Sequence, residues 1–200
     1  MNEIEQVLDF WFGACGPDGA LDRAKQRMWF SDGRQHDSVI RKRFGKLHRR
    51  AARGELDAEW AASPRGTIAL IVVLDQFSRH IHRGKPAAFA QDAAAQRIAL
   101  AGVEQGVERG LIPAQRAFFY LPLEHAEDIR LQQLSTRSFV RLAGEVAPAW
   151  RKEYAGFADY AGHHHDIIER FGRFPHRNSI LGRNSTPEEI EFLKEPGSSF

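Results

Sequence analysis

Residues 68–74, with the sequence Ile-Ala-Leu-Ile-Val-Val-Leu, form the longest uninterrupted apolar run and decide the fold class. Periodicity alone would make this run a buried strand. The chain holds no second β-rich run to pair with it, and a lone strand leaves its backbone groups unsatisfied. We therefore predict a central helix that is apolar on every side because other helices surround it. The run is also far too short to span a membrane.

The composition of the 200 residues agrees with a folded helical domain. Alanine occurs 26 times, whereas valine, isoleucine and threonine together occur 23 times. This balance favours helix, because β-branched side chains lose rotamer freedom in a helix and alanine loses none. Hydrophobic residues make up 42% and charged residues 27%, which excludes wholesale disorder. No Gly/Ser-rich or Pro-rich linker divides the chain, so we expect one all-helical domain over residues 1–200.

Cysteine content and charge limit the cellular setting and the partners. The single cysteine, Cys15, cannot form an internal disulfide, which is typical of a reduced cytoplasmic protein. The N-terminal residues lack a basic segment followed by an apolar one, so we expect no signal peptide and no membrane partner. A net charge of +2 is too small to indicate nucleic acid. Composition leaves the cofactor and the oligomeric state open.

Start signals predict about nine or ten helices joined by short connections. The signals are the capping residues Asn2 and Glu5, then Ser63-Pro64, Pro86, Pro113, Pro148 and Thr186-Pro187. The helices come in consecutive pairs, which suggests an all-α fold of stacked antiparallel helix hairpins. Such a right-handed array would be like that of tetratricopeptide repeats. No pair aligns on another residue by residue, so this topology is a hypothesis.

The first of three polar stretches directly follows the apolar run. On a continuing helix, Asp75 and Arg79 lie on one face and form an intrahelical ion pair. Ser78 and His82 are expected on that face too. An acid next to seven apolar residues is costly to bury unless it is paired. The stretch therefore indicates either a helix-end salt bridge or the wall of a pocket.

The second polar stretch surrounds Pro122, which removes a backbone donor and is expected to kink or break its helix. Directly afterwards, Glu124, His125 and Asp128 fall on one helical face. Such side chains can form an acid–base pair, contact a ligand or hold a divalent metal. Their spacing matches no metal motif, so we assign no metal site. In the alternative interpretation, Glu127 and Asp128 only complement the start of the next helix.

The third stretch runs from Arg170 to Asn184 and holds four arginines and His176, but no acid. Gly172 and Pro175 predict a turn here. Rigid guanidinium groups suit carboxylate or phosphate, so this turn is the best candidate for an anion site. The alternative is a buried ion-pair network with the acids of the other two stretches. The two interpretations are compatible.

Two further patterns are given no part in the predicted site. The basic run of residues 41–53 lacks interleaved aromatic side chains on its basic face, so a solvated helix face is favoured over an RNA or lipid site. The run His163–His165 is followed by Asp166, a doublet that metal-dependent phosphohydrolases also use. The other ligands of such a site are missing at suitable spacing.

These observations predict one polar cavity that binds a small anionic molecule, with acid–base chemistry as an option. The expected proton-handling residues are Glu124, His125 and His176. The expected ligand-binding residues are Asp75, Arg79, Asp128, Arg173, Arg177 and Asn178. The alternative is a helical module that binds a peptide in a groove and has no catalytic activity. In a third interpretation, the network only fixes the fold.

Four motifs in order resemble one known family. They are Val-Leu-Asp-Phe-Trp-Phe-Gly at residues 7–13, Leu-Asp-Gln-Phe-Ser-Arg at 74–79, Tyr-Leu-Pro-Leu-Glu-His at 120–125 and Arg-Phe-Pro-His-Arg-Asn at 173–178. Over essentially its whole length the chain is similar to the bacterial family known as domain of unknown function 924. The resemblance implies an all-helical fold akin to tetratricopeptide repeats. It implies no activity, substrate or cofactor, and fold analogy alone cannot supply a function.

Overall fold

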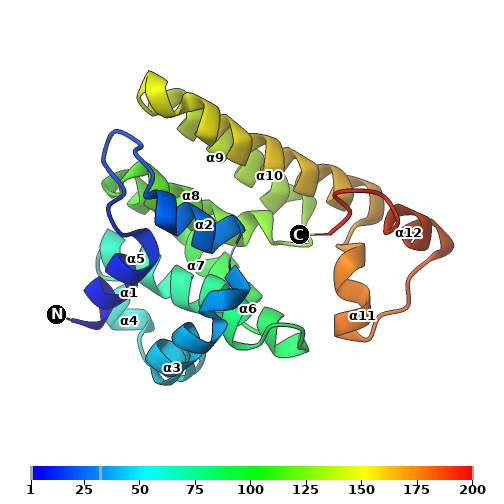
Figure 1. Ribbon diagram of the computed structural model, residues 1–200, viewed down its shortest axis with the longest axis horizontal. Helices are drawn as coiled ribbons and strands as arrows, with labels where there is room; N and C mark the ends of the chain where they lie inside the picture. The colour runs from blue at the N-terminus through cyan, green and yellow to red at the C-terminus, as the bar shows by residue number, and fades with distance from the viewer. Residues whose placement is uncertain (1, 32, 200) are drawn as a thin grey trace.

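The computed structural model describes residues 2–31 and 33–199, and every regular element among them is helical (Figure 1). The α-helical segments are α1 (Glu3–Phe12), α2 (Arg23–Phe30), α3 (Gly33–Ala52), α4 (Asp57–Trp60), α5 (Pro64–Ile71), α6 (Ser78–Ile81), α7 (Asp92–Gln105), α8 (Pro113–Glu124), α9 (Ile129–Glu145), α10 (Arg151–Phe171), α11 (Asn178–Leu181) and α12 (Pro187–Phe192). A π-helical turn, η1 (Val72–Phe77), joins α5 to α6 without a break. The described part therefore holds eleven helices, in agreement with the predicted all-α class and its roughly nine or ten helices. None of these helices is long and apolar enough to cross a membrane.

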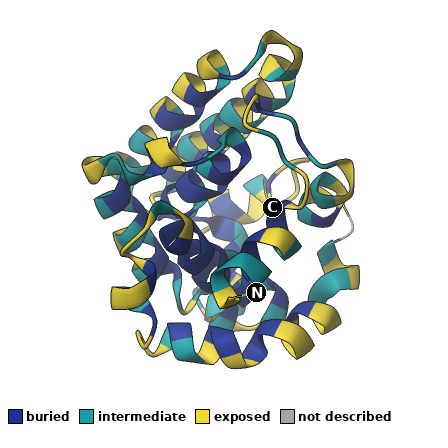
Figure 2. Ribbon diagram, turned by 90° about the vertical axis from the view of Figure 1, so that its left-hand side faces the viewer, coloured by how far each residue is buried: buried dark blue, intermediate teal, exposed yellow. Residues whose placement is uncertain are grey.

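The apolar run that decides the fold lies in the helix of α5, η1 and α6. Ser63 caps α5 by accepting from the backbone N–H of Gly66 at 3.1 Å, and Pro64 occupies the first helical position. Residues 68–74 are at most 1% exposed, which confirms a helix surrounded on all sides. Figure 2 shows buried segments through the middle of the body and exposed ones on its outer helices. A Cβ at Gly66 would clash with the carbonyl group of Trp60, so only glycine lets the end of α4 lie so close to the start of α5.

The π-helical turn divides the polar residues after the apolar run between two faces. Asp75 and Arg79 form the predicted ion pair, with Nη1 at 3.2 Å from Oδ1, and they face α7 and α8. Ser78 instead lies 2.8 Å from a ring nitrogen of His48 in α3, and the ring of His82 lies 5.4 Å from that histidine ring. The expectation of one shared face was therefore wrong for Ser78 and His82. A π turn holds more residues than an α turn, so it rotates the next residues of the helix about the axis.

Aromatic side chains fill the space between α1, α3 and the central helix. The rings of Phe44 and Phe77 stack at 4.7 Å, and Trp11 meets Phe77 and Phe118 edge-on at 5.6 Å. The Asn2 side chain caps α1, as predicted. The apolar residues of the first family motif are thus core residues.

The helices α8, α9 and α10 follow one another as antiparallel neighbours, and α9 and α10 lie side by side in Figure 1. Helix α8 continues past Pro122 and ends two residues later at Glu124. At Pro86, where we expected a helix to start, the chain forms a 3₁₀ turn (Pro86–Phe89), and α7 begins after it at Asp92. Stacking of hairpins as in tetratricopeptide repeats stays a prediction.

We call residues 172–199, which follow α10 and include α11 and α12, the C-terminal lobe (Figure 1). The described residues before them, 2–31 and 33–171, are called the body. Gly172 ends α10 with a φ of 68°, a left-handed conformation that favours glycine, so the predicted turn is confirmed. The reciprocal hydrogen bonds of Thr186 and Glu189 form a capping box at the start of α12. A small apolar cluster that includes Phe171, Phe174 and Phe192 joins the lobe to α10.

Candidate functional site

Asp75 is the centre of a polar cluster between the body and the C-terminal lobe. It is completely buried in the π-helical turn. Its carboxylate accepts from Nδ1 of His125 at 2.9 Å and from Nε2 of Gln76 at 2.6 Å, and it pairs with Arg79. Burial opposes ionisation, but the charge of Arg79 and the contact with His125 hold the pKa of Asp75 well below its usual range. Asp75 is therefore a buried anion with three partners.

Two arginines from distant parts of the chain meet at a second carboxylate. Arg79 donates to both oxygens of Asp92 at 3.0 and 3.2 Å, and Asp92 is the first residue of α7. Nη1 of Arg177, from the C-terminal lobe, lies 3.5 Å from the same carboxylate. It also donates to the backbone carbonyl of His125 at 3.0 Å. The π-helical turn, α7, the end of α8 and the lobe therefore converge at one place.

Aromatic rings hold the guanidinium group of Arg177 on two sides. The group lies 4.4 Å from the ring centre of Phe174 and 4.9 Å from that of Phe89. Arg177 is 6% exposed, and its Nε–H has no hydrogen-bond partner among the described residues. A buried donor left unpaired costs about 1–3 kcal/mol. Burial and the nearby charge of Arg79 lower the pKa of Arg177 to about 10.

His125 has a defined tautomer. An ionised carboxylate only accepts hydrogen bonds, so Nδ1 of His125 carries the proton that it donates to Asp75. Nε2 is then the basic nitrogen. Burial lowers the pKa of His125, so its imidazole is neutral near neutral pH. A neutral histidine oriented by a carboxylate in this way is the arrangement of a general base.

Glu124 holds a proton at neutral pH. It is buried, and burial together with the negative charge of Asp75 raises its pKa to about 8. Nδ1 of His164, on α10, lies 3.5 Å from Oε1 of Glu124, and burial lowers the pKa of this histidine to about 3. Gln132 donates to the backbone carbonyls of Glu124 and Ala126 at 2.6 and 2.7 Å. These bonds fix the end of α8, where two of the three candidate proton-handling residues, Glu124 and His125, lie.

His176 lies at the edge of the cluster. Its ring packs against Phe174, with 5.6 Å between ring centres. Burial and the charge of Arg177 lower the pKa of His176 to about 4. Its imidazole is therefore neutral near neutral pH.

Three of the predicted ligand-binding residues lie outside the cluster. Asp128 accepts from the backbone N–H of Arg130 at 2.8 Å and caps α9, as the alternative interpretation of this residue held. Nε and Nη2 of Arg173 donate to the carboxylate of Glu189 at 2.6 and 2.8 Å. Asn178 donates to the same carboxylate at 3.2 Å. Arg173 and Asn178 thus organise the lobe itself.

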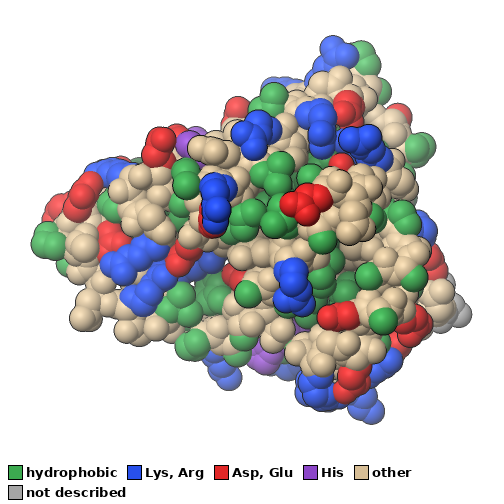
Figure 3. Space-filling model, turned by 180° about the vertical axis from the view of Figure 1, so that it is seen from behind, with side chains coloured by type: hydrophobic (Ala, Val, Ile, Leu, Met, Phe, Trp, Pro, Cys, Tyr) green, Lys and Arg blue, Asp and Glu red, His purple; other side chains and the backbone are tan. Residues whose placement is uncertain are grey.

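One carboxylate attaches the lobe to the body. Glu127, between α8 and α9, accepts from the backbone N–H of Phe174 at 2.8 Å and from the guanidinium group of Arg183 at 2.6 and 2.9 Å. Burial opposes ionisation of Glu127, but these contacts hold its pKa below the usual value. Because they fix the turn that carries Arg177, they position this side chain against the body. On the face seen in Figure 3, basic and acidic side chains gather where the lobe borders the body.

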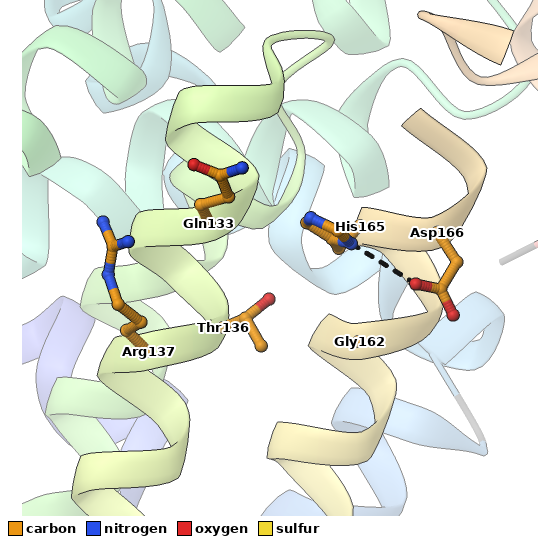
Figure 4. Close-up of a pocket in the computed structure, with 6 residues that line it drawn as sticks. All are labelled: Gln133, Thr136, Arg137, Gly162, His165 and Asp166. Atoms are coloured by element: carbon orange, nitrogen blue, oxygen red, sulfur yellow. Dashed lines mark hydrogen bonds and ion pairs between the residues drawn. The ribbon is translucent and has the colours of Figure 1, made fainter. Parts of the chain in front are cut away.

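A separate cavity of about 290 Å³ lies between α9 and α10 (Figure 4). It is lined by Gln133, Thr136, Arg137, Gly162, His165 and Asp166. The His165 ring lies between the two helices in Figure 4, and its Nδ1 is 3.3 Å from Asp166. Together with Glu169 these two form the only group in the described part whose ligand atoms lie close enough for a metal ion. All three residues come from one helix, and both acids are exposed, so the geometry selects no particular ion.

The family model described as bacterial protein of unknown function (DUF924) matches residues 7–197. The chain belongs to this family. It is also similar to a solved structure of a protein of unknown function from Agrobacterium tumefaciens. The two chains are 36% identical over 96% of each, with a TM-score of 0.77. No curated protein matches the chain.

The resemblance predicted from four motifs is thereby confirmed, and the structure shows what those motifs do in this DUF924 protein. In the first motif, Val7, Leu8, Trp11 and Phe12 are buried in the core, and Gly13 caps the end of α1. The other three motifs, at residues 74–79, 120–125 and 173–178, each supply side chains of the cluster around Asp75.

Sequence reasoning missed two members of the cluster. Asp92 stands in an alanine-rich segment as an ordinary acid in the first turn of a helix, so nothing in its pattern marked it. His164 lies in the histidine run, where the helical period turns it inward while His163 and His165 stay nearer solvent. The helical period of the histidine run, which turns His164 inward, was the sequence signal that could have identified it.

Proposed function

We propose that the cluster around Asp75 binds a small anionic molecule and can perform acid–base chemistry on it. The observation that carries the proposal is the buried guanidinium of Arg177, whose Nε–H has no partner within the described part of the chain. Such a donor, held beside a second arginine and an Asp–His pair, suits a carboxylate or phosphate oxygen.

The charges of the cluster leave no net negative charge that would repel an added anion. Arg79 and Arg177 are balanced by Asp75 and Asp92, while Glu124 is protonated near neutral pH. An incoming anion therefore meets two guanidinium groups and no further ionised acid of this cluster. The side chains of Arg79 and His125 keep 20% and 15% of their surface exposed, so the cluster is open to solvent on their side.

The proposed chemistry assigns one role to each titratable group. Nε2 of His125 accepts a proton, and Asp75 orients the ring and stabilises the imidazolium that forms. Glu124, which carries a proton at neutral pH, is the proposed proton donor. His176 is the third proposed proton-handling residue, at the edge of the cluster.

The test is a thermal-shift screen with inorganic phosphate, sugar phosphates and di- and tricarboxylates. A ligand that binds only the native state raises the melting temperature with its concentration. Arg177→Lys keeps the charge but removes the Nε–H, so it should abolish the shift caused by the best ligand. Arg130→Gln is the control, because Arg130 is exposed and its one ion pair among the described residues is with Asp128. An unchanged ligand shift in Arg177→Lys, with or without a lower melting temperature, would mean that the network only fixes the fold.

A protein-interaction module without catalysis is the second candidate. It is supported by Phe30 of α2, which is 60% exposed and packs against Phe157 of α10 at 5.7 Å between ring centres. This alternative predicts that Phe30→Ser weakens the binding of a partner peptide. Arg177→Lys should leave the binding of that peptide unchanged.

A further inference from the structure

A second cavity, of about 400 Å³, lies near the start of α8, at the other end of that helix from Glu124. It is lined by Arg109, Arg116, Arg141 and Glu145. Arg109 comes from the 3₁₀ turn before α8, Arg116 from the first turns of α8, and Arg141 and Glu145 from the last turns of α9. Three elements therefore direct arginines to one hollow.

The lining has more positive than negative charge. Glu145 pairs with Arg116 and lies 3.7 Å from Nε of Arg141. Arg141 also lies 3.6 Å from the buried carboxylate of Glu108, behind the lining. Arg109 makes no ion pair with any residue that the structure describes. One lining carboxylate thus faces three guanidinium groups, and one of these lacks a counter-ion.

One arginine of the cavity is already held in place. The side chain of Arg116 is 12% exposed, and its Nε and Nη2 each lie 3.4 Å from the hydroxyl of the buried Tyr120. An arginine with a fixed orientation loses less freedom when it binds an anion. Glu145 is different, because it is the last residue of α9 and its side chain is 45% exposed. It can leave its partners at little cost.

We propose that this cavity binds the phosphate group of a small molecule, and that Glu145 is an internal anion which the phosphate displaces. Three guanidinium groups from three elements surround a volume rather than a plane, which suits the tetrahedral oxygens of phosphate better than a flat carboxylate. This site is separate from the cluster around Asp75 and does not depend on the function proposed there.

The test is isothermal titration calorimetry of the full chain with pyrophosphate. Removing the unpaired cation in Arg109→Gln should weaken binding by about tenfold, equivalent to about 1.4 kcal/mol. Removing the competing carboxylate in Glu145→Gln should strengthen binding by about three- to tenfold. The controls are Arg97→Gln and Glu59→Gln, which change exposed residues without ion pairs in the described part. Both controls should bind as the wild type does.

Arg109 is exposed and makes no ion pair within the described part of the chain, so its substitution should leave the melting temperature unchanged. A loss of binding could then not be attributed to unfolding. Equal affinities of Arg109→Gln and wild type would overturn the proposal, as would the absence of saturable binding to Glu145→Gln. Binding to phosphatidic acid vesicles without binding to pyrophosphate would overturn the assignment to a small molecule.

Discussion

The body and the C-terminal lobe are held together by different forces. In the body, the helix of α5, η1 and α6 is surrounded by apolar and aromatic side chains, and residues 68–74 have lost almost all contact with water. The lobe has only a small apolar cluster around Phe174. Its shape depends instead on carboxylates, chiefly Glu189 and Glu127, that receive hydrogen bonds from arginines and the backbone.

This difference matters because the candidate site lies at the boundary between the two. Asp75 and His125 belong to the rigid body, whereas Arg177 belongs to the lobe. Burial of apolar surface is insensitive to salt and pH, but partly exposed ion pairs are weakened by both. Conditions that loosen the lobe should therefore remove Arg177 from the site before the body unfolds.

The largest expected effect is in the body. Phe77→Ala removes a buried ring that stacks on Phe44 and should lower the free energy of unfolding by about 3–5 kcal/mol. Urea denaturation followed by circular dichroism would measure it. The matched variant in the lobe is Phe192→Ala, which removes a half-buried ring and should affect mainly the lobe. If both variants shift the urea midpoint equally, the two regions do not differ as described.

A second effect concerns the boundary. The pKa of Glu124 is raised from its ordinary value of 4.5 to about 8, mainly by burial. Between these values the unfolded chain releases this proton and the native state keeps it, so the wild type should lose stability as pH rises. Glu124→Gln, which mimics the protonated acid, should remove this loss and be a few kcal/mol more stable than wild type at about pH 9. Urea midpoints at about pH 5 and about pH 9 would measure it.

A wild type and a Glu124→Gln variant with the same pH profile would show that this carboxyl group ionises normally. It would then not be the proton donor of the candidate site. Glu191→Gln is the control, since this exposed acid pairs with Lys194 and with no other residue that the structure describes.

The smallest expected effect is in the lobe. The hydrogen bonds from Arg173 lower the pKa of Glu189 to about 2. The stability that Glu189 contributes is therefore present above its ordinary value of 4.5 and is lost as pH falls toward about 2. Glu189→Gln should lower the local stability of α12 by about 1–2 kcal/mol. Hydrogen exchange of amides in α12, compared with those in α5, would measure it.

Two outcomes would contradict this prediction. Equal loss of protection in α5 would mean that the lobe and the body unfold together. Unchanged protection in α12 would mean that the apolar cluster alone holds the lobe. Glu188→Gln is the control, because its pair with Arg170 lies at the surface.

The fold class could be predicted because the sequence offered only one way to satisfy the backbone of residues 68–74. Proline and capping signals placed the starts of α5, α8 and α12 correctly. The π-helical turn could not be predicted, since it reflects packing against several neighbouring helices and has no sequence signal of its own. For the same reason Ser78 was assigned to the wrong face.

The site was predictable where a charge followed an apolar run along the same helix, as for Asp75 and Arg79. The site was not predictable where the ion-pair partner of a side chain lies on a distant element and depends on the tertiary packing. Arg173 and Arg177 look alike in the sequence, yet one binds Glu189 within the lobe and the other reaches Asp92. The partner of Arg173 lies on α12 and that of Arg177 on α7, and neither pairing has a signal in the local sequence.

The π-helical turn within the central helix also has a consequence for insertions and deletions. Such a turn is an α-helix with one residue too many. Because the wide turn absorbs this extra residue, deleting Val73 should restore regular hydrogen bonding while Asp75 and Arg79 keep their direction. A one-residue deletion in α9, which has no such turn, would instead rotate one half of that helix against the other by about 100°. The irregularity therefore makes this part of the central helix tolerant of a change in chain length.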